Sequence, residues 1–127
     1  MKPLLLLLPL ILLSTACQPD CSTLKNGTFE FAHDDGKATV VTREGDRQVE
    51  SFNNGERVAE YQVEWLNDCE YLLYSRRAIS GPDWAVGSEL DTLRFQILNV
   101  REDSFTIQGT FITRNRPSVM MEGRILE

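Results

Sequence analysis

The residues best suited to active-site chemistry lie around a single imidazole. His33 is the one histidine in 127 residues, and Asp34 and Asp35 follow it directly. A catalytic histidine needs a nucleophile and an orienting group within reach, whereas a histidine before Asp-Asp-Gly is typical of a solvated turn. The two aspartates could bind Ca²⁺, but that ion takes six or more oxygen ligands. We therefore expect a turn here, and no metal, cofactor or catalytic residue in the chain.

Enzymatic activity and nucleic-acid binding are both disfavoured. The sequence contains no phosphate-binding glycine loop, no H-E-x-x-H and no G-x-S-x-G. Nineteen acidic and 13 basic residues give a net charge of −6, which suits a protein poorly for neutralising phosphates. An enzyme is the least favoured class, and no nucleic acid is expected among the partners.

A long polar connection, Ala78 to Ser88, contains the residues most typical of a binding surface. Gly81 and Gly87 punctuate it, and Pro82, Asp83 and Trp84 stand between them. Loops on a rigid scaffold often carry binding sites, and tryptophan is frequent among binding hot spots. We expect Pro82, Asp83 and Trp84 to contact a ligand or partner. In the alternative interpretation, the indole simply plugs one end of the fold.

The first 16 residues read as a lipoprotein signal peptide. Lys2 precedes a ten-residue apolar run, Leu4 to Leu13, and small residues lead to Cys17. As a helix this run covers roughly 15 Å, about half of a bilayer's hydrocarbon core, so it fits a signal peptide better than a membrane span. A cysteine directly after small residues resembles the lipidation site of bacterial lipoproteins, although Ser14 stands where leucine is usual. An ordinary secretory peptide cut after Ala16 is the alternative.

The remaining cysteines form a pair. If Cys17 carries the lipid, Cys21 and Cys69 are left in an oxidising compartment, where a disulfide between them is the simplest arrangement. We expect residues 17–26 to be the lipidated cysteine and a short tether, followed by one domain over 27–127. The expected location is the cell envelope, on the outer membrane, with the periplasmic and surface faces both open.

The domain alternates apolar and polar residues, the pattern of half-buried strands. It is clearest from Ala59 to Trp65, whereas Arg47 to Phe52 is ambiguous. Gln48, Glu50, Glu60, Gln62 and Glu64 are expected together on one outer face. Eight aromatic residues are expected on inner faces: Phe29, Phe31, Tyr61, Trp65, Tyr71, Phe95, Phe105 and Phe111.

Eight strand candidates follow one another through tight turns, of which Asn54-Gly55 is the strongest hairpin signal. Such connections make sequential strands antiparallel neighbours. Closing the sheet removes its exposed edges, so we expect an all-β, eight-stranded up-and-down barrel of the lipocalin kind. A two-sheet sandwich is the alternative. Residues 20–26 could add a helical turn that plugs one end.

Three segments carry a resemblance to a known family. They are C-S-T-L-K-N-G-T-F from Cys21, T-R-E-G-D-R-Q-V-E from Thr42, and Y-Q-V-E-W-L-N-D-C-E-Y-L-L from Tyr61. The chain resembles a family of short, uncharacterised Gram-negative lipoproteins with a lipocalin-like, calycin-type barrel. The resemblance spans Cys21 to Leu73, and the second half shares only its strand pattern. It implies the same cysteine pairing and barrel, and it brings no activity and no functional residues.

These observations favour a membrane-anchored, non-catalytic binding module for a small apolar or amphipathic ligand, or for an envelope protein. An enzyme inhibitor or an assembly component of the envelope is the alternative. Cavity volume separates the two classes, because a roomy lumen favours a ligand, whereas a filled lumen leaves only surface and loops.

Overall fold

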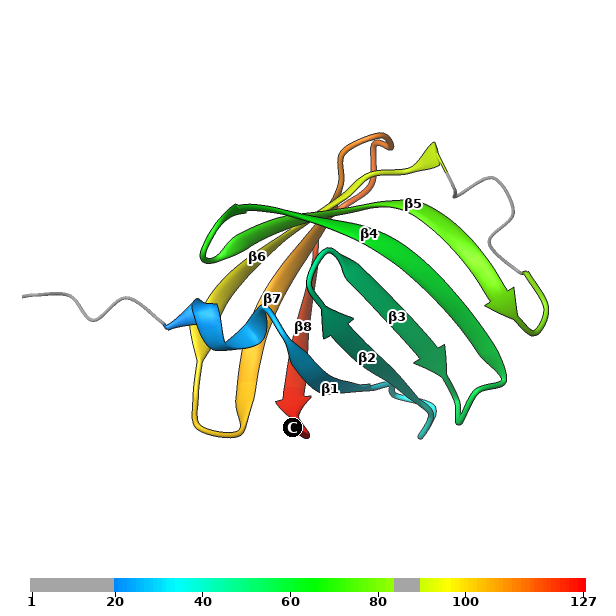
Figure 1. Cartoon of the computed structure of the whole chain (residues 1–127), viewed down its shortest axis with the longest axis horizontal. Coiled ribbons are helices and arrows are strands. Elements are labelled where there is room, and N and C mark those ends of the chain that lie inside the picture. The colour runs from blue at the N-terminus through cyan, green and yellow to red at the C-terminus, as the bar shows by residue number, and fades with distance from the viewer. Residues whose placement is uncertain (1–19, 84–89) are drawn as a thin grey trace, which may run out of the picture.

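The computed structural model describes residues 20–83 and 90–127 and shows a closed, antiparallel eight-stranded barrel. The strands follow one another in chain order, and β8 pairs with β1 (Figure 1). This confirms the expected up-and-down barrel and excludes the sandwich. The elements are η1 (Cys21–Leu24), β1 (Gly27–Ala32), β2 (Ala38–Glu44), β3 (Arg47–Phe52), β4 (Arg57–Asn67), β5 (Glu70–Ser80), β6 (Leu93–Val100), β7 (Ser104–Phe111) and β8 (Val119–Ile125).

The tight turns form where glycine and asparagine allow left-handed backbone. Asn53, Asn54 and Gly55 have φ of 46°, 56° and 87° between β3 and β4, and Gly45 has φ of 61° between β2 and β3. The expected long connection begins later than Ala78, because β5 continues to Ser80 by pairing with the start of β4. None of the described helices is long and apolar enough to cross a membrane.

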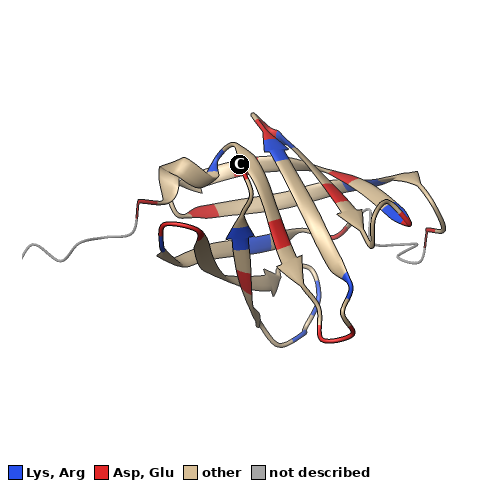
Figure 2. Cartoon of the chain, turned by 90° about the horizontal axis from the view of Figure 1, so that it is seen from below, with Lys and Arg blue, Asp and Glu red and all other residues tan. Residues whose placement is uncertain are grey.

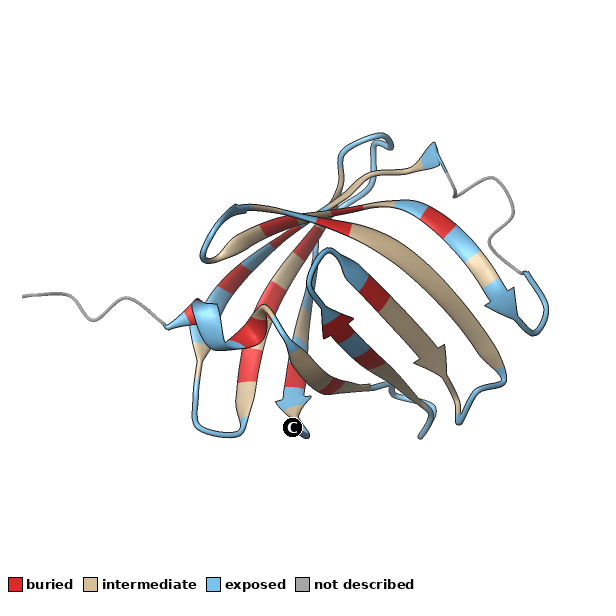
Figure 3. Ribbon diagram, in the orientation of Figure 1, coloured by how far each residue is buried: buried red, intermediate tan, exposed pale blue. Residues whose placement is uncertain are grey.

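The core fills the inner faces of the strands, visible as red bands in Figure 3. Seven of the eight expected aromatics belong to it or pack against it, and Phe111 is half-buried at the end of β7. Two strand glycines make room for these rings. A Cβ at Gly123 would lie 2.3 Å from the Phe105 ring, and one at Gly109 would lie 2.8 Å from the Phe95 ring. The buried apolar residues are Cys21, Leu24, Phe29, Val41, Val63, Tyr71, Leu73, Phe95, Ile97, Phe105 and Ile107.

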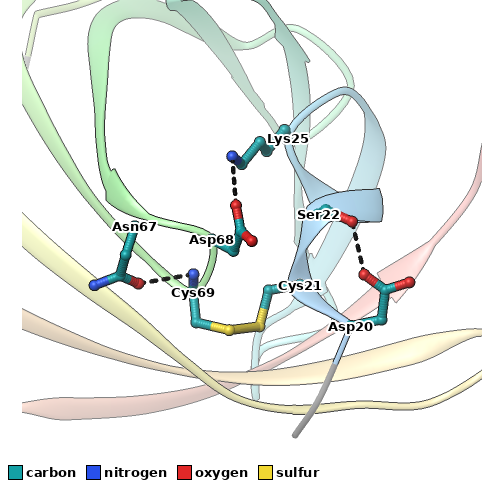
Figure 4. A network of polar contacts seen from close by, with 7 residues as sticks. All are labelled: Asp20, Cys21, Ser22, Lys25, Asn67, Asp68 and Cys69. Atoms are coloured by element: carbon teal, nitrogen blue, oxygen red, sulfur yellow. Dashed lines mark hydrogen bonds and ion pairs between the residues drawn. A yellow bond between two sulfur atoms is a disulfide. The ribbon is translucent and has the colours of Figure 1, made fainter.

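One end of the barrel is closed by η1, the helical turn expected within residues 20–26. Cys21 and Leu24 are each 1% exposed, and a disulfide joins Cys21 to Cys69, as expected (Figure 4). The Lys25 ammonium lies 2.9 Å from Asp68 in the same β4–β5 turn. The start of the described chain is thus fixed to the barrel by covalent and ionic contacts.

Arg43 ties η1 to the inside of the barrel. Its guanidinium donates to the Leu24 carbonyl oxygen, to Gln48 Oε1 at 2.9 Å and to the Tyr71 hydroxyl at 3.0 Å. It also lies 4.5 Å from the centre of the Tyr71 ring and 5.4 Å from that of Trp65. A cation on aromatic faces with its donors satisfied is tolerated in a core, so this end of the lumen is filled.

The β1–β8 seam is the shortest pairing of the barrel. Only two residue pairs, Phe29 with Ile125 and Glu30 with Arg124, join the strands, whereas β1 and β2 share six pairs. Thr28 adds backbone hydrogen bonds with Leu126 and Glu127 on one side of these pairs, and an open groove of about 620 Å³ lies between β1 and β8 on the other. Outside the barrel, acidic and basic positions are interspersed over strands and turns (Figure 2), and exposed ion pairs of this kind add little stability.

Candidate functional site

The barrel end opposite η1 is open and leads to a cavity of about 220 Å³ inside the lumen. The β1–β2 and β3–β4 turns lie at this end, together with the end of β5. Its walls combine apolar side chains with charged ones. The lining residues are His33, Thr39, Glu50, Phe52, Arg57, Val58, Ala59, Tyr61, Arg76, Ala78, Ser80 and Pro82.

A second cavity of about 170 Å³ adjoins the first and shares His33, Thr39 and Glu50 with it. Its remaining lining is Phe31, Val41, Arg43, Gln48, Tyr71, Phe95, Ile107 and Met121. Each cavity corresponds to the liquid volume of about six or seven water molecules, less than the pocket of a drug-sized ligand. The aromatic side chains thus fill the η1 end and leave a small polar-lined space at the other.

The structure corrects the expected outer polar face. Gln48 is 2% exposed, and Glu50 lines both cavities, whereas Glu60 lies outside, paired with Arg47 at 2.9 Å. The pairing of Val41 with Glu50 places that glutamate beside an inward-facing apolar residue. Because β3 is polar on both faces, its alternation does not reveal which face is inside.

A bulge in β5 brings a second arginine into the lumen. Ser75 has φ of 51°, and the β4–β5 register shifts between the Glu60–Arg77 and Gln62–Tyr74 pairs. An extra residue in one strand changes which side chains face inward. Arg76 therefore lines the cavity, whereas Arg77 pairs outside with Glu60 at 3.0 Å.

Glu50 is held in an unusual electrostatic setting. Burial raises the pKa of its carboxyl above the ordinary value, while the hydrogen bond from Gln48 and the positive charges of Arg43 and Arg76 lower it. Burial also raises the pKa of Tyr61, and the negative charge of Glu50 adds to that effect. Burial thus raises the pKa of both acidic groups, while the neighbouring guanidinium charges lower it.

The residues expected to bind a ligand fall partly at this mouth. Pro82 lines the cavity nearer the opening, of about 220 Å³, which we call the upper cavity; the cavity of about 170 Å³ is the deeper one. The Asp83 carboxylate lies 3.0 Å from Arg76. Trp84 and the expected lipidation site, Cys17, lie outside the described residues.

His33 is exposed beside the β1–β2 turn, as expected, and its Nε2 lies 2.8 Å from the Thr39 hydroxyl. Its place in the lining of both cavities was missed, because sequence gives no sign of which loop side chains fold over a mouth. No group of three or more acidic, histidine or cysteine side chains in the described ranges could hold a metal ion.

The chain matches no family model, no curated protein and no solved structure. The cavity is therefore interpreted from its own chemistry. It offers hydrogen-bond donors and acceptors next to apolar walls, in a space closed on the η1 side and open at the other end. That combination suits non-covalent binding of a small molecule with one polar group.

Proposed function

We propose that the protein is a lipid-anchored envelope binding module, which holds a small amphipathic ligand in the open end of its barrel. One observation carries the proposal: Glu50, Arg76 and Tyr61 lie together in the lining of the same lumen cavity. Burying charges costs several kcal/mol even when they are paired, and apolar side chains could fill the same space. Arg43 holds η1, whereas these three groups line unfilled space, with Asp83 paired to Arg76 and Gln48 donating to Glu50.

The apolar part of such a ligand has surfaces to contact. Phe52 and Val58 line the upper cavity, and Val41, Phe95 and Ile107 line the deeper one. Burying hydrocarbon there gains about 0.8 kcal/mol per methylene. The polar residues would fix orientation and the apolar ones would supply affinity, which is the usual division of roles in ligand pockets.

The lipid anchor in this proposal is inferred from the sequence. The apolar run before Cys17 favours lipidation and an outer-membrane location in the cell envelope. The described chain enters the barrel at the η1 end, and the cavity opens at the opposite end. A short tether at Cys17 would therefore attach the barrel by the end away from its mouth and leave the mouth accessible.

The test uses three amphiphiles of equal chain length, 1-octanol, octanoate and octylamine, with the protein expressed from the full chain. Nuclear magnetic resonance should show shift changes confined to lumen residues with at least one of them. Ala59→Trp fills the upper cavity and should abolish these changes. Glu64→Trp, on the exposed face of the same strand, should preserve them. If none of the amphiphiles perturbs the lumen, or if Ala59→Trp has no effect, the proposed function is wrong.

A further inference from the structure

The charged side chains that line the lumen are mostly basic, whereas the chain as a whole is acidic. The full sequence carries six more acidic than basic residues. Among the described residues, the two cavities are instead lined by three arginines, Arg43, Arg57 and Arg76, and by one acid, Glu50. Inside a barrel, where the effective dielectric constant is low, this local excess acts more strongly than the surface charges do.

The three arginines that line the lumen make different contacts. Arg43 is committed to the Leu24 carbonyl, Gln48 and Tyr71. Arg76 has a side chain only 7% exposed and lies against Asp83 near the mouth. Arg57 stacks on the Phe52 ring with its guanidinium carbon 4.1 Å from the ring centre. Arg57 and Arg76 are therefore the guanidinium groups that a ligand entering the upper cavity meets first.

The opening is bordered by a further cation and an imidazole. The Lys37 ammonium lies 5.7 Å from the centre of the Phe52 ring, and the His33 ring lies 5.6 Å from it. Phe52 thus forms an apolar surface surrounded by Arg57, Lys37 and His33. The Glu56 carboxylate lies near Lys37 and Arg57 as well, so two permanent cations face one acid beside a ring on which a hydrocarbon chain can pack.

Acidic groups at the lumen limit how much negative charge it can accept. Glu50 lines both cavities, and burial raises the pKa of its carboxyl. Gln48 donates a hydrogen bond to one of the Glu50 carboxyl oxygens. Asp83 offsets part of the charge of Arg76, so the lumen suits a single negative charge better than a multiply charged group.

We propose, building on the function proposed above, that the ligand is a small carboxylate-headed amphiphile. Its carboxylate lies beside Arg57 and Arg76, and its hydrocarbon part extends past Phe52 toward the deeper cavity. The planar guanidinium groups match the two oxygens of a carboxylate. The charged head remains near the mouth, because Arg57 and Arg76 line the upper cavity there.

The experiment ranks the same three amphiphiles by calorimetric titration of the protein expressed from the full chain. Octanoate should bind more tightly than 1-octanol, and octylamine should bind most weakly. Arg57→Gln should weaken octanoate about tenfold, the equivalent of roughly 1.4 kcal/mol for a lost charge-assisted hydrogen bond, and should leave 1-octanol unchanged. The control is Arg47→Gln, which removes an exposed arginine paired with Glu60 on the outer face and should change neither affinity.

A second variant keeps the test decisive if Arg57→Gln fails to fold. Glu50→Gln removes the acid of the lining and keeps its shape, so it should strengthen octanoate binding and weaken octylamine binding. Tighter binding of octylamine, or equal affinities of octanoate and 1-octanol, would overturn the carboxylate assignment and leave the lumen as a binding site. Absence of binding by all three amphiphiles would overturn the proposed function itself.

Discussion

Replacing Arg43 by methionine should destabilise the barrel strongly while leaving its apolar volume nearly intact. The side chain is 5% exposed, and its guanidinium donates to three acceptors on η1, β3 and β5. Methionine would leave the Leu24 carbonyl, Gln48 and the Tyr71 hydroxyl without their donor. Removing one member of a buried charged network typically costs about 3–5 kcal/mol.

The matched control is Arg47→Met. Arg47 lies on the outer surface, with its side chain 55% exposed and paired to Glu60. Exposed pairs of this kind contribute roughly 0–1 kcal/mol, so this variant should unfold close to the wild type. The difference between the two variants isolates the buried network from the general effect of losing one positive charge.

Urea unfolding followed by tryptophan fluorescence measures both free energies, and hydrogen exchange locates the loss. The Lys25 amide, which donates to the Ser22 carbonyl at the end of η1, should exchange faster in Arg43→Met because η1 loses one of its ties. If Arg43→Met and Arg47→Met lose equal stability, the guanidinium network does not hold the closed end and the reasoning fails.

Four further predictions concern the anchor, the disulfide and two glutamates. Cys17→Ala should abolish acyl labelling and membrane partition, and unchanged partition in that variant would remove the case for a lipid anchor. Replacing Cys21 and Cys69 by serine should lower the free energy of unfolding by about 4 kcal/mol, since the disulfide closes a loop with a sequence separation of 48. A loss below about 1 kcal/mol in urea titrations would show that η1 docks on the barrel without the disulfide. Glu50→Gln should raise the melting temperature at neutral pH. Burial raises the pKa of Glu50 in the folded protein above its pKa in the unfolded chain. The stability that the protonated carboxyl contributes is therefore complete below the unfolded-state pKa and is lost as pH rises through the folded-state pKa. Glu60→Gln should lower the melting temperature at neutral pH, because the hydrogen bond from Arg47 lowers the pKa of Glu60 in the folded protein. The stability that the Glu60 carboxylate contributes is present above the unfolded-state pKa and is lost as pH falls through the folded-state pKa. For either variant, a melting-temperature difference from wild type that does not vary with pH would contradict the assignment.

The parts of the fold that sequence predicts are those where local chemistry admits one interpretation. Ala59 to Trp65 alternates cleanly and forms the middle of β4, and Asn54-Gly55 forms a turn with left-handed backbone. Cys21 and Cys69 are the pair left once Cys17 is assigned to the lipid, and they are bonded.

The candidate site could not be predicted in the same way, because its members depend on register. Gln48 and Glu50 lie on a strand with polar residues on both faces, so only the pairing with β2 shows that they point inward. Arg76 reaches the lumen through the bulge at Ser75, and serine has no special preference for that conformation. Arg76 and Arg77 are therefore adjacent in sequence but lie on opposite faces of the barrel wall, because of a bulge that the sequence does not reveal.

The disulfide also determines how the barrel would bear a mechanical load. A pull on the chain at Asp20 reaches Cys21 first, and the bridge passes the force to Cys69 at the β4–β5 turn. Without it, tension would run through η1 into β1 and would load the β1–β8 seam, which has only two residue pairs, together with the six β1–β2 pairs. The bridge directs the load into β4 and β5, whose ladder spans eight pairs, so a barrel tethered by its N-terminus is held through its longest hairpin instead of its shortest pairing.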